Sequence, residues 1–346
     1  MPTITHDDLA TFVADILIAA DVPAGEAATV ARLTVASDLA GHDSHGVAMI
    51  PGYVRHVEAG EIRPGAPFEV VRETSTTTVI DGHGGFGFVV ADRAMDITID
   101  KASRHGMAAT TVRGQSHVGR LAAYPVKAAR HGHIAIAMAS GRGGKWVVPF
   151  GGCQARMGTN PISVAVPSAL PGVFAFDMAT SAVAGGAVRV AQRAGETIPT
   201  GWIVDADGRP TTDPDDLDRG GALLPFGGTQ AHKGYALSAT IEALANLLAG
   251  LGVAASDAAH GNSCFMACFA VDAFGDRAQY EREVAEFAQA LQATPPADGF
   301  AEVLYPGEQA HRREAENLRS GIHLRDATWD ELRALAARYG VTDDTR

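Results

Sequence analysis

From about residue 67 onward, short runs rich in β-branched and aromatic residues alternate with longer runs of helical periodicity. The β-rich runs are FEVVRE, TTTVI, MAATTV and HIAIAMAS, and helical segments begin near Phe88 and Gly119. Strands that alternate with helices in this way are typical of α/β domains, in which helices cover a sheet. This alternation constrains the fold more than any other feature, and it predicts the α/β class.

Three glycines in this region, Gly82, Gly84 and Gly87, have the G-x-G-x-x-G spacing of a dinucleotide-binding turn. A strand (residues 76–80) precedes them and a helix follows, as that motif requires. The motif also requires an acidic residue about 20 residues further on, at the end of the next strand. Residues 113–115 are RGQ, with no carboxylate. We therefore expect a turn that packs a helix closely against a strand, not a Rossmann motif.

The two ends of the chain have helical patterns. Thr5 is placed to cap a first helix, Pro23 lies near the start of a second, and the tail from about residue 310 is helical and charged. Residues 140–230 are instead rich in glycine and proline, with ISVAVP and VFAFDMA as expected strands. Further on, CFMACFAVDAF predicts a buried strand.

Composition excludes several function classes. The chain has 346 residues and a formal net charge of -12, which disfavours nucleic acid and anionic membranes as partners. Three cysteines form no disulfide framework, and the N-terminus lacks the basic and apolar regions of a signal peptide. The apolar run 237–255 contains Glu242 and Asn246, so we expect a buried helix rather than a membrane span. These features predict a cytoplasmic protein.

Two short clusters have the wrong spacing for zinc. His42, Asp43 and His45 lie close together, and Cys264 and Cys268 are four apart, but neither group has a C-x-x-C pair or a partner H-x-x-x-H. We expect no metal site. A serine hydrolase is also disfavoured, because the chain has no G-x-S-x-G sequence.

The stretch GHDSHG (residues 41–46) is a first candidate for chemistry. If a helix begins here, His45, Met49 and Tyr53 share one face, since they are four residues apart. A histidine with a pKa near 6.5 can exchange a proton with a substrate oxygen. Taken alone, the stretch fits a histidine that caps or bridges helices slightly better.

The stretch GQSHVGR (residues 114–120) has a similar composition. If Ser116 caps a helix, His117 and Arg120 lie on one side of its first turn. A helix N-terminus and an arginine both attract an anion, such as a substrate carboxylate or a phosphate. A surface capping turn explains the residues equally well. Further along, Lys233 is expected just before a helix, where it can meet a phosphate.

Together, these motifs resemble one family. DSHGVAMIPGYV, SHVGRLAAY, PFGG, MGTNPISVAVP, DMATS, HKGYAL and YPGE stand in the order found in the malate/L-lactate dehydrogenase family that is unrelated to Rossmann enzymes. The resemblance covers roughly residues 5 to 325. It implies a sulfolactate-dehydrogenase-like fold, with a non-Rossmann mixed-sheet nucleotide domain and a helical domain. Residues 1–66 and 308–346 would form the helical domain, and 67–307 the α/β domain, which is divisible near 115–140 and 230–260.

The resemblance also implies a function: NAD(P)-dependent interconversion of a 2-hydroxy acid and a 2-oxo acid, in a homodimer. It assigns His117 as the acid/base and His45 as a second catalytic histidine. It makes Ser44 and Tyr53 substrate contacts. The implied coenzyme-binding set is Ser140, Asp177, Met178, Ala179, Thr180, Lys233, Gly234, Gly307 and Glu308.

Two departures from the family pattern bear on the substrate. Many members have arginine where Met49 stands and histidine where Cys264 stands. Both changes resemble the hydroxycarboxylate dehydrogenase B subgroup, which accepts larger 2-oxo acids. The missing arginine would contribute about 1.5–3 kcal/mol to carboxylate binding. Arg120 is our candidate replacement, and Met49 would offer an adaptable apolar wall.

The pattern fits NAD and NADP alike. Arg142 and Lys145 are placed to meet a 2′-phosphate, but they fit a solvated turn equally well. A non-catalytic protein that binds a small acid on the same scaffold is an alternative function, and a metal-dependent hydrolase is a weaker one. If the dehydrogenase assignment holds, a protonated histidine neutralises the substrate oxygen during reduction, so lower pH favours reduction and higher pH favours oxidation.

Overall fold

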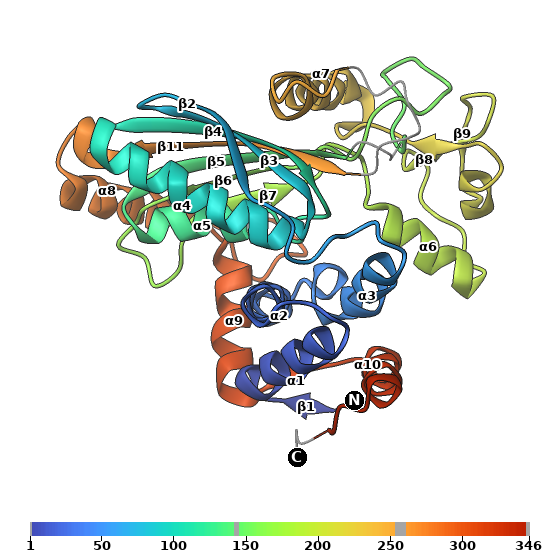
Figure 1. Cartoon of the computed structure of the whole chain (residues 1–346). Helices are drawn as coiled ribbons and strands as arrows, with labels where there is room; N and C mark the ends of the chain where they lie inside the picture. Colours follow the sequence, from blue (N-terminus) through green and yellow to red (C-terminus); the bar gives the residue numbers. More distant parts are fainter. Residues whose placement is uncertain (1, 142–144, 253–260, 344–346) are drawn as a thin grey trace.

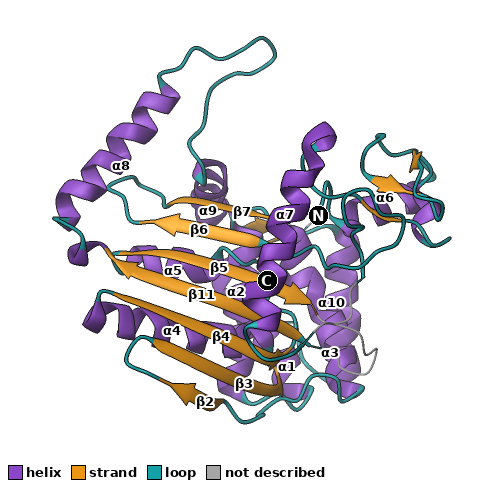
Figure 2. Ribbon diagram, turned by 90° about the horizontal axis from the view of Figure 1, so that it is seen from above, coloured by secondary structure: helices purple, strands orange, loops and turns teal. Residues whose placement is uncertain are grey.

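The computed structural model describes residues 2–141, 145–252 and 261–343. A large sheet forms its centre, a group of helices lies below the sheet in Figure 1, and a smaller part lies beside it. The sheet has seven strands, which Figure 2 shows from above. In order across the sheet they are β2 (Glu69–Glu73), β3 (Thr77–Gly85), β4 (Met107–Gln115), β11 (Asn262–Ala270), β5 (His133–Gly141), β6 (Ile162–Val166) and β7 (Phe174–Met178).

The sheet is mixed, as the family resemblance predicted. β3 and β4 run parallel, whereas all other neighbours in the sheet run antiparallel. β11 comes late in the chain but inserts between β4 and β5 at the centre. Its residues Cys264, Met266 and Cys268 are completely buried, which confirms the buried strand predicted there. The strand is apolar because other elements cover both of its faces.

Two helices cover one face of the sheet: α4 (Gly87–His105) and α5 (Ala123–Arg130). α5 was expected to begin near Gly119 and begins four residues later. Small residues form the contact, with Ala91 and Ala94 of α4 and Ala135 and Ala137 of β5 all fully buried. Alanine lets a helix approach a sheet closely, so the packing is tight on this face.

The glycine-rich stretch is strand and helix rather than a turn. β3 continues to Gly85, and α4 begins at Gly87. A Cβ at Gly87 would lie 2.2 Å from the carbonyl oxygen of Ser116, so only glycine fits. The close packing of helix and strand expected here is observed. Its effect is to bring the start of α4 against the chain that leaves β4.

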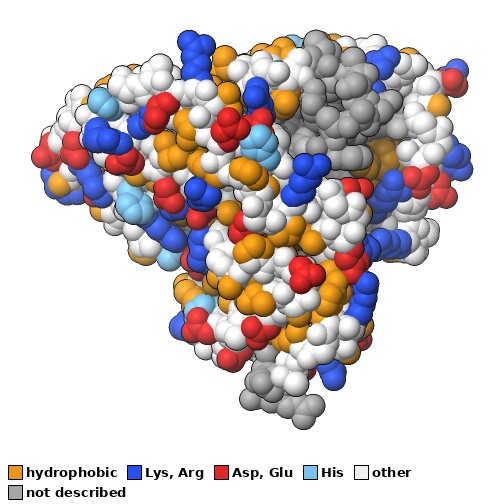
Figure 3. Space-filling view, viewed as in Figure 1, with side chains coloured by type: hydrophobic (Ala, Val, Ile, Leu, Met, Phe, Trp, Pro, Cys, Tyr) orange, Lys and Arg blue, Asp and Glu red, His pale blue; other side chains and the backbone are white. Residues whose placement is uncertain are grey.

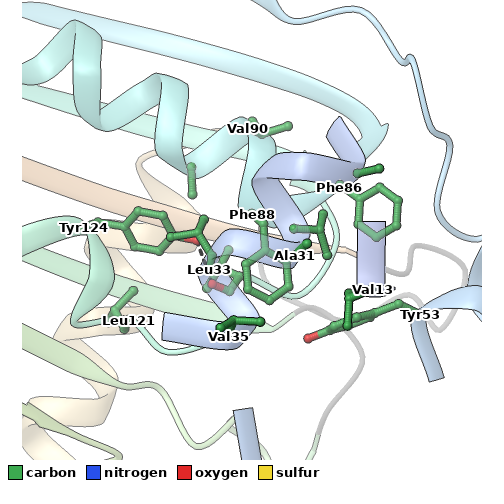
Figure 4. Close-up of a cluster of buried hydrophobic side chains, with 14 of the residues drawn as sticks. Val13, Ala31, Leu33, Val35, Tyr53, Phe86, Phe88, Val90, Leu121 and Tyr124 are labelled. Carbon is green, nitrogen blue, oxygen red and sulfur yellow. Dashed lines mark hydrogen bonds between the residues drawn. The ribbon is translucent and has the colours of Figure 1, made fainter. Parts of the chain in front are cut away.

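The helical part joins the two ends of the chain. Its helices are α1 (His6–Ala19), α2 (Ala24–Leu39), α3 (Ile50–Glu58), α9 (Glu308–Ser320) and α10 (Asp326–Tyr339). Thr5 caps α1 as predicted, because its hydroxyl accepts the N–H of Asp8. A short strand at each end, β1 (Thr3–Ile4) and β12 (Ile322–His323), pairs antiparallel. One hydrophobic core is continuous from these helices to the sheet, and Figure 4 shows Leu33 and Val35 of α2 near Phe88 and Tyr124.

The remaining part has its own small core, which includes Val147, Val188, Ile203 and Leu223. It contains a three-stranded sheet and the helices α6 and α7, at the upper right of Figure 1. Its elements are α6 (Gly185–Ala194), β8 (Ile203–Val204), β9 (Pro210–Thr211), η3 (Pro214–Leu217), β10 (Ala222–Leu223), η4 (Gly228–Gln230), α7 (Ala231–Ile241) and the π-helical turn η5 (Glu242–Leu247). After β11 follow η6 (Val271–Ala273) and α8 (Arg277–Gln292).

Within the apolar run 237–255, the helix extends to Leu247 and is only partly buried. Ile241 and Ala245 pack against the sheet, whereas Leu247 and Leu248 are exposed. Residues 253–260 lie outside the described part of the chain. None of the described helices has the length and apolarity needed to cross a lipid bilayer. In Figure 3, acidic and basic side chains are interspersed over the visible face.

Candidate active site

Two histidines and a tyrosine from distant segments meet where β4 ends. The ring centroids of His45 and His117 are 5.8 Å apart. The hydroxyl of Tyr53, in α3, lies 2.7 Å from Nδ1 of His117. Ser44 is exposed, and its hydroxyl lies 2.9 Å from Nδ1 of His45. The structure therefore brings together four residues that the sequence placed in two separate motifs.

The segment that carries His45 is not one continuous helix, so the expected single face of His45, Met49 and Tyr53 is wrong. Two short 3-10 turns, η1 (Asp43–His45) and η2 (Val47–Met49), precede α3. Between them Gly46 has an extended backbone, which interrupts any helix. Tyr53 still points toward the site from the first turns of α3, and Met49 packs at the edge of the hydrophobic core.

Asp38 holds this segment in place, and it was missed in the sequence. Its carboxylate accepts the backbone N–H of Val47 at 2.8 Å, and its side chain is almost fully buried. A Cβ at Gly46 would lie 1.9 Å from Asp38 Oδ1, so the carboxylate needs a glycine beside it. The available signal was an acidic residue within the mostly apolar helix 24–39.

The expected role of Ser116 is also wrong. Its hydroxyl accepts the N–H of Gly87 at 2.8 Å, so it caps α4 rather than a helix of its own. His117 and Arg120 consequently lie in a non-helical connection, not on the first turn of a helix. Gly119 lets this connection fold back, because it has a φ of 65° and a Cβ there would meet Phe88. No helix N-terminus assists an anion at this point.

Burial controls the charges in this cluster. Together with a smaller effect of the nearby His45, it lowers the pKa of His117 to about 4. Burial also lowers the pKa of His45, with Arg120 as a second cause. The pKa of Tyr53 is raised far above its usual range because its hydroxyl is enclosed. In the free protein near neutral pH, both imidazoles and the phenol are therefore uncharged.

A cavity of about 1070 Å³ lies next to the cluster, between the helical part and the β7 edge of the sheet. His42, Arg120, Asp177 and Gly307 are among the residues that line it. Buried pockets for organic ligands have about 300–1,000 Å³, so a large ligand fits. The cavity extends past α5 and α9, and His45 and His117 are not among the residues that line it.

Arg120 and Asp177 are opposite charges in this cavity that make no direct ion pair. Among the described residues no hydrogen-bond partner is found for Nε of Arg120, which is buried. The Asp177 carboxylate accepts the N–H of Ala122 at 2.9 Å and is open to the cavity. The protein that surrounds it on its other sides raises its pKa, while Arg120 acts in the opposite direction. The guanidinium is thus available to a ligand anion.

Several residues of the implied coenzyme set gather at the same end of the sheet. Ser140, at the end of β5, donates to the Glu242 carboxylate at 2.6 Å. Thr180 is buried and donates to the carbonyl oxygen of Asn160. Met178 is the last residue of β7, and Ala179 links it to Thr180. The hydroxyls of Ser140 and Thr180 are therefore already engaged with protein groups, and these residues would meet a ligand through their surroundings.

Glu242 and Asn160 were missed in the sequence, although they organise this end of the sheet. Asn160 donates to Glu242 at 3.2 Å and has a positive φ of 31°. Its own Oδ1 is buried and has no hydrogen-bond partner in the described part of the chain, and the same holds for the hydroxyl of Ser238. Glu242 begins a π-helical turn, a distortion often found at functional sites. An acid that begins a π-turn becomes recognisable only once the helix is seen.

Lys233 is exposed in the first turn of α7, not before the helix as expected. Gly234 follows it, and a Cβ there would lie 2.1 Å from the carbonyl oxygen of Phe226. Gly307 has a φ of 95° and packs against the backbone of β7, at the wall of the cavity. Glu308 is buried and accepts from Arg312 and Gln292, so it anchors the start of α9.

Three expectations remain, which concern Arg142, Cys264 and metal binding. Arg142 lies outside the described residues. Cys264 accepts a hydrogen bond from Gln115 within the sheet core, and burial raises the pKa of its thiol to about 12. Within the described ranges, no group of three or more His, Cys, Asp or Glu side chains is placed to hold a metal ion.

Residues 4–333 match the sequence model of the malate/L-lactate dehydrogenase family. The chain belongs to this family. An L-lactate dehydrogenase from Cupriavidus necator is 37% identical over 96% of both chains. A hydroxycarboxylate dehydrogenase B from Escherichia coli K12 is 34% identical, over 92% of this chain and 90% of the relative. The family is one of oxidoreductases.

Structure agrees with sequence on this point. Sulfolactate dehydrogenase from Methanocaldococcus jannaschii superposes on this dehydrogenase family member with a TM-score of 0.88 and 30% identity, over 99% of both chains. The predicted sulfolactate-dehydrogenase-like fold is therefore confirmed. Both the family and the fold were reached from short motifs, each of which was weak alone.

Proposed function

We propose that this protein is an NAD(P)-dependent oxidoreductase that interconverts a 2-hydroxy acid and a 2-oxo acid. One observation carries the proposal: two imidazoles from distant segments lie 5.8 Å apart, beside a large cavity with an unpartnered arginine Nε. Family membership and the named activities of the relatives support it. His117 is the acid/base, and His45 assists it.

The residues that we assign to the coenzyme fit a dinucleotide. Asp177 and Gly307 line a cavity of sufficient size, and glycine at 307 lets the chain there lie close to the backbone of β7. Lys233 is exposed and can pair with a phosphate. When bound, the coenzyme supplies or accepts the hydride. The protein's residues orient the substrate and move the proton.

Arg120 binds the substrate carboxylate in this proposal. Its guanidinium is charged at all relevant pH values and suits a planar carboxylate. Ser44 is exposed beside His45 and donates to the substrate. Met49 is a partly buried, flexible apolar group. This combination favours 2-oxo acids with a side chain larger than that of pyruvate.

His117 must be protonated to donate to the substrate oxygen during reduction, and it must be neutral to accept a proton during oxidation. Its pKa near 4 in the free protein means that bound ligands have to raise it. A carboxylate held by Arg120 acts in that direction, because a nearby anion favours the imidazolium. Reduction is therefore favoured at lower pH and oxidation at higher pH.

Replacing His117 by alanine tests the acid/base role. Loss of a general acid lowers turnover by about 100-fold or more. The assay is a screen of 2-oxo acids, phenylpyruvate and 2-oxoglutarate among them, with NADH and NADPH. The His131→Ala variant is the control, because His131 lines the same cavity but lies far along α5. Near-normal turnover of His117→Ala would transfer the role to His45. Coenzyme binding by the wild type without any turnover would support a non-catalytic acid-binding protein.

Replacing Arg120 by leucine tests the carboxylate contact. The expected result is a fall of kcat/KM by about 10-fold to 100-fold, the size of a lost charged hydrogen bond. Arg130→Leu is the matched control, because Arg130 lines the same cavity but pairs with Glu314 at 3.6 Å. The methyl ester of the same 2-oxo acid should be insensitive to both changes. An equal loss in the two variants would contradict the assignment.

We further propose that the protein is cytoplasmic, as its composition indicates, and that it forms a homodimer, as the family resemblance implies. NAD and NADP are both compatible with the residues assigned here. The division into a helical domain (1–66 and 308–346) and an α/β domain (67–307) likewise stays a proposal, because one core joins the two.

A further inference from the structure

The contact between Tyr53 and His117 gives this tyrosine a different task from binding substrate. Its side chain is 2% exposed and packs edge-on against Phe88, with ring centroids 5.5 Å apart. Figure 4 shows it beside Phe88 at the border of the buried cluster. Its hydroxyl is directed at Nδ1 of His117, at 2.7 Å. A hydroxyl so placed is engaged by the imidazole before any substrate arrives.

A second contact defines the state of the same nitrogen. The backbone N–H of Gly119 also points at Nδ1 of His117, at 3.3 Å. A backbone N–H can only donate, so Nδ1 must carry a lone pair. The single proton of the neutral ring is then on Nε2. The tyrosine hydroxyl donates to Nδ1 in this state.

The same hydroxyl serves the charged ring as well. If His117 becomes an imidazolium, Nδ1–H donates, and the tyrosine oxygen can accept because a hydroxyl is both donor and acceptor. After Nε2–H gives its proton to the substrate oxygen, the ring is neutral with its proton on Nδ1. Nε2 is then bare and can take the proton back in oxidation. The backbone N–H of Gly119 can only donate, so it cannot accept a hydrogen bond from Nδ1–H.

From this geometry we propose that Tyr53 is a positioning residue, which holds Nδ1 of His117 in both protonation states so that only Nε2 exchanges a proton with substrate. The inference rests on the proposed function. In this inference Tyr53 contacts His117 and not the substrate, in place of the substrate contact that the family resemblance implied. The other titratable group that faces His117 is His45, from η1, and Arg120, three residues after His117, acts on His45.

Tyr53→Phe removes the hydroxyl and keeps the ring. Tyr124→Phe is a close control: Tyr124 is fully buried in the same core, and its hydroxyl donates to the carbonyl oxygen of Val118 rather than to an imidazole. We expect kcat/KM for reduction to fall by about 10-fold to 100-fold in Tyr53→Phe, the usual effect of losing a group that orients a functional imidazole. As pH rises, kcat/KM of Tyr53→Phe should begin to fall at a lower pH than that of the wild type, because the imidazolium of His117 loses an acceptor.

A measurement without turnover separates this inference from the proposed function. Nitrogen-15 NMR of the free protein reports the protonation of each ring nitrogen of His117. Because the Gly119 N–H can only donate, the neutral ring should carry its proton on Nε2 in the wild type and in both variants. On acidification the imidazolium of His117 should form at a lower pH in Tyr53→Phe than in the wild type and Tyr124→Phe, because its Nδ1–H loses the tyrosine oxygen as an acceptor. If the two variants titrate together and have the same pH profile of turnover, the inference is overturned. If no variant reduces any 2-oxo acid but the titrations differ as expected, the proposed function fails while the positioning role stands.

Discussion

At the scale of single residues, the least expected group is the carboxyl of Asp38. It is 4% exposed and accepts the backbone N–H of Val47, and no described cation pairs with it. Burial, with a smaller contribution from the charge of Asp43, raises its pKa from 3.8 to about 7. The carboxyl is thus an acid that the fold keeps partly protonated near neutrality. Its function is to fix the short segment that carries Ser44 and His45.

A raised pKa in the folded state makes the protein lose stability as pH rises. Between pH 4 and 7 the unfolded chain has an ionised Asp38 while the folded chain does not, so the free energy of unfolding falls across this window. The loss is at most about 4 kcal/mol, at about 1.4 kcal/mol per pH unit. Asp38→Asn keeps an acceptor for Val47 and removes the titration. Urea unfolding at pH 4.5, 6 and 8 should show the variant gaining stability over the wild type as pH rises. Parallel profiles would refute the raised pKa.

The contacts that make the site could not be predicted from the sequence, for a physical reason. Tyr53 and His117 are separated by 64 positions, and each has an ordinary local environment in its own motif. Local patterns report periodicity and capping, so they identified two candidate histidines but not their meeting. Only the family resemblance placed them in one site. Asp38 and Glu242 were missed because the contacts of an acid depend on the partners that it finds in three dimensions.

At the scale of elements, Ser116 shows why the predicted helix start at this residue was wrong. Ser116 has the sequence pattern of an N-cap, and it does cap a helix, but that helix is α4, which lies earlier in the chain. A side chain that satisfies a distant helix cannot be distinguished from a local cap by spacing alone. The strands and α4 were predictable, because their hydrophobic periodicity reflects the packing between the sheet and the helix.

The approach of α4 to this connection can be tested at Gly87. An alanine Cβ would meet the carbonyl oxygens of Ser116 and His117 at 2.2 and 2.5 Å, so the helix and the connection must separate. We expect a loss of about 1–3 kcal/mol in the free energy of unfolding, together with lower turnover. Gly186→Ala is the control, because Gly186 also lies at the start of a helix but has no atom near its Cβ position. Thermal unfolding of both variants decides the point, and equal stability would argue against tight packing at Gly87.

At the scale of the whole molecule, the fold depends on segments that are distant in the chain. β1 and β12 pair the two ends, and α9 packs against α2. The class followed from the alternation of strand and helix patterns and the mixed sheet from the order of the motifs, whereas the small part with β8, β9 and β10 had no clear signal. Its strands have two residues each, too short for any periodicity.

The central place of β11 has a temporal consequence during synthesis. β4 and β5 leave the ribosome with one edge each unpaired, and the strand that joins them is translated only after residue 261. At about 5–20 residues per second, the wait is on the order of ten seconds. During that time two apolar edges are open to wrong partners. We therefore expect the nascent chain to need a chaperone until its last third has emerged.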